Sequence, residues 1–408
     1  METGQAALPF SPRMADTPGS NYLAGRVGVA FYAFYVALYA QIAIGITFMP
    51  LWLKAQGLSE ATVGMCMAAA AIIAVVVNPI VGTVADRTRL NKAILVTLII
   101  CASLAMLVLS ATSGVLLVAA VYLVYRALIS PLVPLAESIL IANLTVYRLD
   151  FGQVRAWGSA SVVATTLLCG FLVDWFDTRA ILYLLLAILM AKIVTSNGLP
   201  ARARSGQPAI TTAVILRALR NRGFLLLLGS AAISQACHGV FYAFSTFRWL
   251  EAGHSTSAIG IFWSLGVGME ILAFVFGRHI AARLSPGRII LIACVAGILR
   301  WGLFGLSAAL APTLVVQFLQ GATLGLAQVG VAAYIRHNIA PEFLSSATGV
   351  YYAAAGLIAA LAIMAGAYLY PISSSYVFFF AALLCALGTI AAAFLASQHT
   401  RHGEAPPS

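Results

Sequence analysis

The chain is divided into long apolar runs, separated by short connections that hold most of its charged side chains. A helix needs about 20 residues to cross the hydrocarbon core of a bilayer. Runs of that length are expected near residues 27–51, 62–85, 93–112, 115–146, 154–173, 179–198, 223–247, 257–277, 289–310, 313–335, 346–370 and 376–397. Only 9% of the 408 residues are charged and 62% are hydrophobic, which excludes an ordinary soluble domain. The sequence predicts an all-α integral membrane protein with twelve transmembrane helices.

The lysines and arginines of the connections predict how the helices are oriented, because cytoplasmic connections carry an excess of both residues. The even-numbered connections hold Arg87, Arg89, Lys92, Arg148, Arg202, Arg204, Arg217, Arg220, Arg222, Arg278, Arg283, Arg288 and Arg336. The odd-numbered connections hold little beyond Lys54, Arg179 and Arg248. The number of runs is even, so we expect both termini on the cytoplasmic side. A net charge of +11 scattered in this way indicates a lipid bilayer as partner and no nucleic acid.

The longest connection, residues 199–222, is basic and contains Pro, Ser and Gly. It divides the chain into two six-helix bundles, expected at 26–198 and 223–397. We expect flexible cytoplasmic tails at 1–25 and 398–408. Gly82 to Val96 resembles Gly277 to Ile292, which makes a weak internal repeat. Two related bundles with a site at their interface are typical of secondary transporters.

Among the ionisable residues inside apolar runs, four stand out: Glu137, Arg155, Glu270 and Arg300. Charges at membrane depth are costly, so they persist mainly where they pair, face a bundle interior, or contact a substrate or proton. Glu137 and Arg155 lie in neighbouring runs with a short polar turn between them, and Glu270 and Arg300 repeat this arrangement in the second half. A structural ion pair that fastens two helices is the alternative for each of the two pairs.

Three further ionisable residues also lie inside apolar runs. Arg126 lies eleven residues before Glu137, hence on the same helix face, and is a possible second partner of that acid. Lys192 lies near the end of its run and is expected to extend to the interface. His238 lies in the seventh run, either as a hydrogen-bonded core histidine or in a direct role.

The connection after the second run reads GTVADRTRL, with Gly82, Asp86, Arg87 and Arg89 in the pattern GxxxDRxR. This pattern resembles the signature loop of the major facilitator superfamily. In physical terms, Gly82 permits close helix approach, and Asp86 can cap a helix and pair with an arginine as a conformational latch. A tight polar turn that obeys the charge rule is the alternative.

Narrower stretches resemble the branch of this superfamily that contains lactose permease and the phenylpropionate permeases. They are FMPLWLKAQGLSEATVG from Phe48, DFGQVRAWGS from Asp150, HGVFYAF from His238 and ILRWG from Ile298. The resemblance implies alternating access in a bacterial inner membrane. It also implies substrate binding by Glu137, Arg155, Arg300 and His238, with proton coupling at Glu270 or Glu137.

The sequence also departs from lactose permease. The tenth run offers Gln320 and Thr323 where that permease has a proton-translocating His and Glu, and Val162 stands where it stacks its sugar on a Trp. A disaccharide substrate is therefore in doubt. The aromatic residues of the first and seventh runs are expected either to bind an aromatic ring of the substrate or simply to pack the helices together. They are Tyr32, Tyr35, Tyr39, Phe241, Tyr242 and Phe244.

We therefore expect a proton-coupled importer of a small organic acid such as 3-phenylpropionate, functioning as a monomer. A sugar or nucleoside symporter, an exporter of hydrophobic compounds, and a ligand sensor without flux are the alternatives. The sequence has no Walker A, GxSxG or HExxH motif, so no enzyme, cofactor or metal site is predicted. All six cysteines lie in apolar runs and are interpreted as buried hydrophobes.

Overall fold

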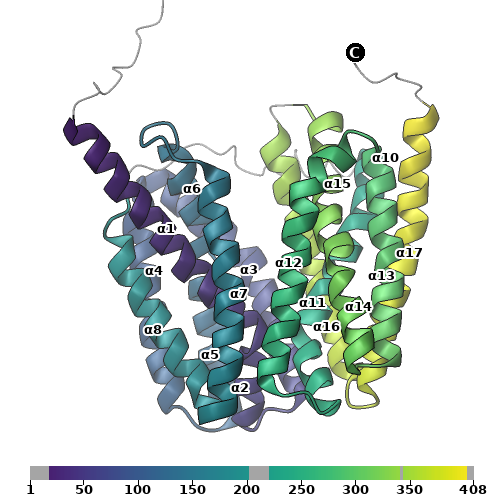
Figure 1. Cartoon of the computed structure of the whole chain (residues 1–408), viewed down its shortest axis with the longest axis horizontal. Coiled ribbons are helices and arrows are strands. Elements are labelled where there is room, and N and C mark those ends of the chain that lie inside the picture. The colour runs from purple at the N-terminus through teal and green to yellow at the C-terminus, as the bar shows by residue number, and fades with distance from the viewer. Residues whose placement is uncertain (1–17, 202–219, 341–342, 402–408) are drawn as a thin grey trace, which may run out of the picture.

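The protein is described by a computed structural model that covers residues 18–201, 220–340 and 343–401. Within these ranges, 12 helical stretches are long and apolar enough to cross a membrane, which confirms the predicted all-α membrane fold. Figure 1 shows them as two bundles side by side, with the start of α1 and the end of α17 at the same edge. We call this the terminal edge and the other the far edge.

The helices of the first half are α1 (Pro18–Thr47), α2 (Met49–Ala55), α3 (Glu60–Thr88), α4 (Asn91–Ala111), α5 (Val115–Ile129), α6 (Leu132–Asn143), α7 (Phe151–Phe176) and α8 (Arg179–Ser196). Those of the second half are α10 (Arg222–Leu227), the π-helical turn η1 (Leu228–Ala232), α11 (Ile233–Glu251), α12 (Thr256–Ala281), α13 (Pro286–Leu306), α14 (Leu310–Phe318), the π-helical turn η2 (Gly321–Leu326), α15 (Ala327–Asn338), α16 (Leu344–Leu369) and α17 (Ser374–Arg401).

Several helix limits differ from the expected runs. The helix α1 begins at Pro18, so residues 18–25 are helical where a flexible tail was expected, and α17 extends four residues beyond 397. The fourth span is divided into α5 and α6 and ends at Asn143 rather than 146. Pro131 lies at this division, where its missing N–H interrupts the helical hydrogen bonds. The central connection at 199–222 lies mostly outside the described residues, as do the outer parts of both tails.

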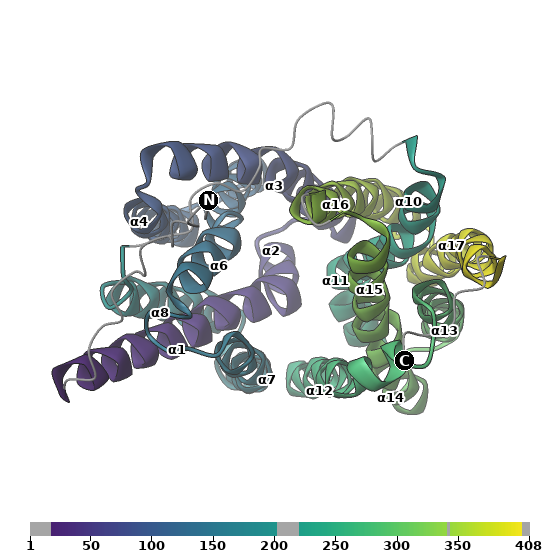
Figure 2. The same ribbon diagram turned by 90° about the horizontal axis from the view of Figure 1, so that it is seen from above.

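The two halves meet mainly through two helix pairs, α7 with α12 and α3 with α16, which Figure 2 shows side by side. Gly170 and Gly260 make the first pair possible. A Cβ atom on Gly170 would lie 2.5 Å from the Thr256 carbonyl oxygen, and one on Gly260 would lie 2.6 Å from that of Thr166. Both glycines therefore serve close helix approach.

The hydrogen bonds that join the halves gather toward the far edge, where α1 and α7 end. Thr246 on α11 donates to the carbonyl oxygen of Thr47 over 2.8 Å. Thr166 on α7 and Ser264 on α12 are joined by a hydrogen bond of 2.9 Å. The two bundles are therefore fastened together at the far edge.

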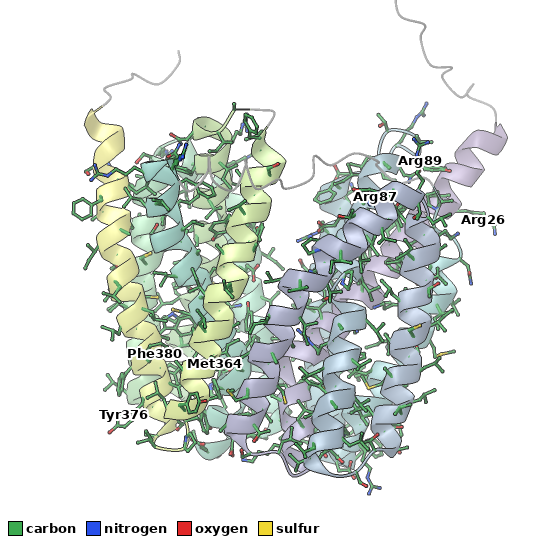
Figure 3. All side chains as sticks on the ribbon, turned by 180° about the vertical axis from the view of Figure 1, so that it is seen from behind. Arg26, Arg87, Arg89, Met364, Tyr376 and Phe380 are labelled. Carbon is green, nitrogen blue, oxygen red and sulfur yellow. The ribbon has the colours of Figure 1, made fainter. Side chains whose placement is uncertain are left out.

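The loop with the GxxxDRxR pattern differs from its expected structure. A Cβ atom on Gly82 would meet nothing within 4 Å, so this glycine does not mark a close helix approach. Asp86 lies inside α3 instead of capping a helix, and within the described residues it forms no ion pair. Arg89 ends α3 in the left-handed region with φ 58°. Arg87 and Arg89 lie toward the terminal edge, as does Arg26 (Figure 3), so the loop is a basic turn at that edge.

Candidate functional site

A cavity of about 230 Å³ lies between the two halves, on the terminal-edge side of the contacts described above. The first half lines it from α1 and α7, and the second half from α11, α12 and the span that contains η2. The lining residues are Tyr39, Ile42, Ala43, Ile46, Thr47, Arg155, Ser159, Val162, Thr166, Tyr242, Trp263, Val267, Glu270, Ile271, Phe274, Gln320 and Gln328. Two of them carry charge, Arg155 and Glu270, and they belong to opposite halves.

Arg155 stands on α7 and forms an ion pair with Glu137 of α6, so the structure brings together the two residues that the sequence had paired. The ring of Tyr39 lies 5.1 Å from the guanidinium carbon and that of Phe151 lies 6.0 Å away. The two charged side chains keep 42% and 31% of their surface exposed. The pair is therefore accessible to a solute, unlike an ion pair sealed between two helices.

Glu270 lines the cavity from α12 and is half-buried. Gln320 lines the same cavity, and Arg300 and Arg155 are the cations that interact electrostatically with Glu270. No ion pair joins Glu270 to Arg300 among the described residues, contrary to the expected repeat of the first pair. In the second half, therefore, Glu270 lines the cavity and Arg300 lies buried behind it, without an ion pair between the two.

Arg300 is fully buried on α13 and is not among the described residues that line the cavity. Its guanidinium donates to neutral acceptors: the carbonyl oxygen of Val316 (2.9 Å), Nε2 of His238 (3.0 Å), the hydroxyl of Thr323 (2.9 Å), and the amide oxygens of Gln320 (2.7 Å) and Gln317 (3.4 Å). The rings of Phe241 and Trp301 lie 4.7 and 4.3 Å from it. A buried cation thus has its hydrogen bonds satisfied without an acid.

The tautomer of His238 follows from these contacts. An arginine has no acceptor, so Nε2 must accept the hydrogen bond from Arg300. The proton then lies on Nδ1, which donates to the carbonyl oxygen of Ser234 over 3.1 Å. His238 is fully buried and does not line the cavity. In this structure it is therefore a neutral neighbour that supports Arg300 behind the cavity wall.

Lys192 does not extend to the interface as expected, because α8 packs against α1 and encloses it. Its ammonium is fully buried and donates to the amide oxygen of Gln41, whose nitrogen donates to the hydroxyl of Tyr125 over 2.6 Å. Arg126 is not a second partner of Glu137 within the described residues. Its Nε is buried without a hydrogen-bond partner.

The aromatic side chains separate into cavity-lining and packing groups. Tyr39 and Tyr242 line the cavity, as does Trp263, which the sequence had not singled out although it lies seven residues before Glu270 on the same helix face. Phe241 packs on Arg300, and Phe244 stacks on Tyr370 with ring centres 5.2 Å apart. Within residues 18–201, 220–340 and 343–401, no three His, Cys, Asp or Glu side chains gather so as to hold a metal ion.

Comparison with known proteins identifies relatives along most of the chain. Residues 29–382 match the MFS_1 like family. The chain is 30% identical over 357 residues to an Escherichia coli (strain K12) protein named probable 3-phenylpropionic acid transporter, covering 86% of this chain and 93% of that one. It is 24% identical to the maltose permease of Geobacillus stearothermophilus, covering 92% and 96% of the two chains.

Solved structures show the same fold. The crystal structure of nucleoside transporter NupG superposes with a TM-score of 0.78 at 15% sequence identity, covering 91% of this chain and 98% of that one. A bacterial homologue of the human lysosomal transporter Spinster, in an inward-facing and unoccupied conformation, superposes with a TM-score of 0.66 at 13% identity, covering 97% and 100%. With the twelve spans and the family match, these results establish that the chain belongs to the MFS_1 like family of major facilitator superfamily transporters and is not an enzyme.

Proposed function

We propose that this transporter imports a small organic acid together with protons, with 3-phenylpropionate as the first substrate to test. The observation that carries the proposal is the placement of Arg155 and Glu270 on opposite walls of one cavity. The cation can bind the carboxylate of a substrate, and the acid can bind and release a proton. Apolar and aromatic side chains occupy much of the remaining wall, which suits a ring. The name of the Escherichia coli relative supports the same substrate class.

Arg155 recognises the carboxylate in this proposal. Its planar fork of donors matches a carboxylate, and Tyr39 lies against the guanidinium. Glu137 occupies the guanidinium while the cavity is empty. An arriving carboxylate takes over this contact, so Arg155 is never left without an anion.

Glu270 carries the proton. Two carboxylates in one small cavity repel, so a substrate anion fits best when Glu270 is neutral. Proton and anion then enter as a pair, and rocking of the two halves exposes both to the other side. Neither Arg300 nor His238 touches the substrate, because both are fully buried behind the cavity wall.

The orientation of the transporter in the membrane is inferred from the charged connections. Arg87, Arg89 and Arg26 lie at the terminal edge (Figure 3), and the positive-inside rule assigns that edge to the cytoplasm of a bacterial cell. The far edge, at which the halves are fastened, then faces outward. In this orientation the cavity lies on the cytoplasmic side of the contacts between the halves, as expected of a state from which an importer releases its substrate.

The size of the cavity favours a small molecule. Its volume of about 230 Å³ is below the roughly 300–1,000 Å³ of pockets that enclose drug-sized ligands. This argues against a disaccharide such as that of the maltose permease relative. A nucleoside symporter remains the second candidate, since Gln328, Ser159 and Thr47 add neutral hydrogen-bonding groups to the wall.

Binding to the purified protein in nanodiscs tests the substrate class. We expect 3-phenylpropionate to bind and 3-phenylpropanamide, nearly the same shape without the charge, to bind at least about 10-fold more weakly. Arg155→Gln should abolish this preference, whereas Arg126→Gln, which alters a cation outside the cavity lining, should keep it. Binding of uridine without binding of the carboxylate would replace the proposal by the nucleoside alternative.

A further inference from the structure

We infer that Gln320 is the residue of the second half that contacts the transported molecule, and that Arg300 is a positioning residue that acts through it. This inference rests on the proposed function and assigns the roles within the same site. Gln320 lines the cavity, whereas Arg300 is fully buried behind it. The two side chains are joined by a hydrogen bond of 2.7 Å.

The contact with Arg300 fixes the orientation of the Gln320 amide. A guanidinium offers only donors, so the amide oxygen must face Arg300. The amide nitrogen then points the other way, toward the cavity that Glu270 also lines. A glutamine that could rotate freely would present either end. Held by Arg300, it presents two N–H donors to the cavity.

The surrounding backbone keeps the amide in this place. Gln317, Gln320 and Thr323 follow one another at three-residue spacing and all contact Arg300, because they share one face of the tenth span. The π-helical turn η2 begins immediately after Gln320, at Gly321. Such turns are rare and occur often at functional sites.

Gly266 on α12 lies against the oxygen end of the same amide. A Cβ atom at this position would lie 2.7 Å from the amide oxygen of Gln320 and 3.1 Å from that of Gln317. An alanine there would therefore displace the end of the Gln320 side chain without touching Arg300. Gly268 lies two residues further along α12, and a Cβ atom there would meet nothing within 4 Å. Gly266→Ala is therefore the perturbing variant, and Gly268→Ala is its matched control.

The arrangement gives Glu270 and the substrate a shared donor. When Glu270 is ionised, the Gln320 N–H groups stabilise its carboxylate. When Glu270 is protonated, the same groups are released to a substrate carboxylate that Arg155 holds from the opposite wall. Arg300 supplies the orientation and not the contact, which explains why a cation without an acid partner lies behind this wall.

Binding of 3-phenylpropionate to purified protein in nanodiscs is the first measurement. A hydrogen bond to a charged group is worth roughly 10-fold in affinity or more. We therefore expect Gly266→Ala and Gln320→Leu each to weaken binding by about that factor, and Gly268→Ala to bind like the wild type. Arg300→Gln should weaken binding in the wild-type background but add nothing in the Gln320→Leu background. An equal further loss in both backgrounds would show that Arg300 acts directly and would overturn the inference.

A second measurement needs no substrate. The carboxyl band of Glu270, identified in the infrared spectrum by its loss in Glu270→Gln, is titrated with pH in empty protein. The charged and titratable groups around Glu270 are Arg155, Arg300, Tyr39 and Tyr242. All four are retained in Gly266→Ala and Gln320→Leu.

In both variants the ionised carboxylate loses its donor, so the midpoint of the titration should move to higher pH, while Gly268→Ala leaves it unchanged. An unchanged midpoint in Gly266→Ala and Gln320→Leu would overturn the inference. If the midpoint moves but 3-phenylpropionate does not bind to the wild type, the inference stands and the proposed substrate fails.

Discussion

Asp174 of the first half caps the amino terminus of α12, which begins with Thr256 in the second half. Its carboxylate accepts hydrogen bonds from the backbone N–H of Thr256 (3.0 Å), the backbone N–H of Ser257 (2.8 Å) and the hydroxyl of Thr256 (2.5 Å). A negative charge at a helix amino terminus is favourable, because the free N–H groups and the helix dipole are positive there. Asp174 is therefore a latch across the far edge, which must open for the cavity to face the other way.

The substitution Asp174→Asn weakens this latch. We expect a larger population that is open at the far edge, since the charge–dipole interaction contributes about 0.3–2 kcal/mol. Electron paramagnetic resonance distances between spin labels at the exposed positions 183 and 376 would measure it. Asp177→Asn is the control, because Asp177 caps Arg179 within its own half (2.6 Å). Identical distance distributions for Asp174→Asn and the wild type would contradict the latch.

Substitutions of Glu137 and Arg155 test whether Glu137 competes with the substrate for the guanidinium or has a purely structural role. If Glu137 holds the guanidinium only until the substrate arrives, Glu137→Gln removes a competitor and should lower the Kd of 3-phenylpropionate several-fold. Arg155→Lys should raise that Kd about 10-fold or more, because a lysine cannot make the paired contacts of the arginine fork. Calorimetric titration of both variants measures this. A loss of folded protein in Glu137→Gln would instead favour a structural ion pair.

The buried amine of Lys192 yields a stability prediction. Gln41→Ala leaves this group without its acceptor and should destabilise the protein by about 1–3 kcal/mol. Lys192→Met removes the buried polar group together with its need for a partner and should cost less. Thermal unfolding in nanodiscs compares the two, with Tyr125→Phe as the control that removes only the second hydrogen bond of Gln41. A larger loss for Lys192→Met would contradict this account.

Much of the fold could be predicted from the sequence, because the length of the apolar runs and the position of the basic connections are local properties. The pair of Glu137 and Arg155 was also predictable, since two opposite charges at membrane depth in neighbouring helices have few other partners. Pro131 marks the division of the fourth span, but the unbroken apolar run at 115–146 predicts one long helix.

The surroundings of Arg300 were not predictable. Its acceptors on the tenth span are fixed by how α13 packs against α14 and η2, and no sequence pattern gives that register. Its expected partner Glu270 lies instead on the cavity wall, in front of Arg300. Lys192 was misplaced for a related reason. Its position four residues before the end of α8 indicated the interface, but packing against α1 encloses it.

Uptake of labelled 3-phenylpropionate into proteoliposomes tests the central claim most directly. The measurement compares an imposed inward proton gradient with and without a protonophore, for the wild type and for Glu270→Gln. The account predicts accumulation above equilibrium in the wild type that collapses with the protonophore. It also predicts that Glu270→Gln retains exchange of labelled for unlabelled substrate but loses accumulation. Uphill accumulation by Glu270→Gln with an unchanged response to the gradient would contradict the assignment of the proton to Glu270, and accumulation insensitive to the protonophore would contradict proton coupling.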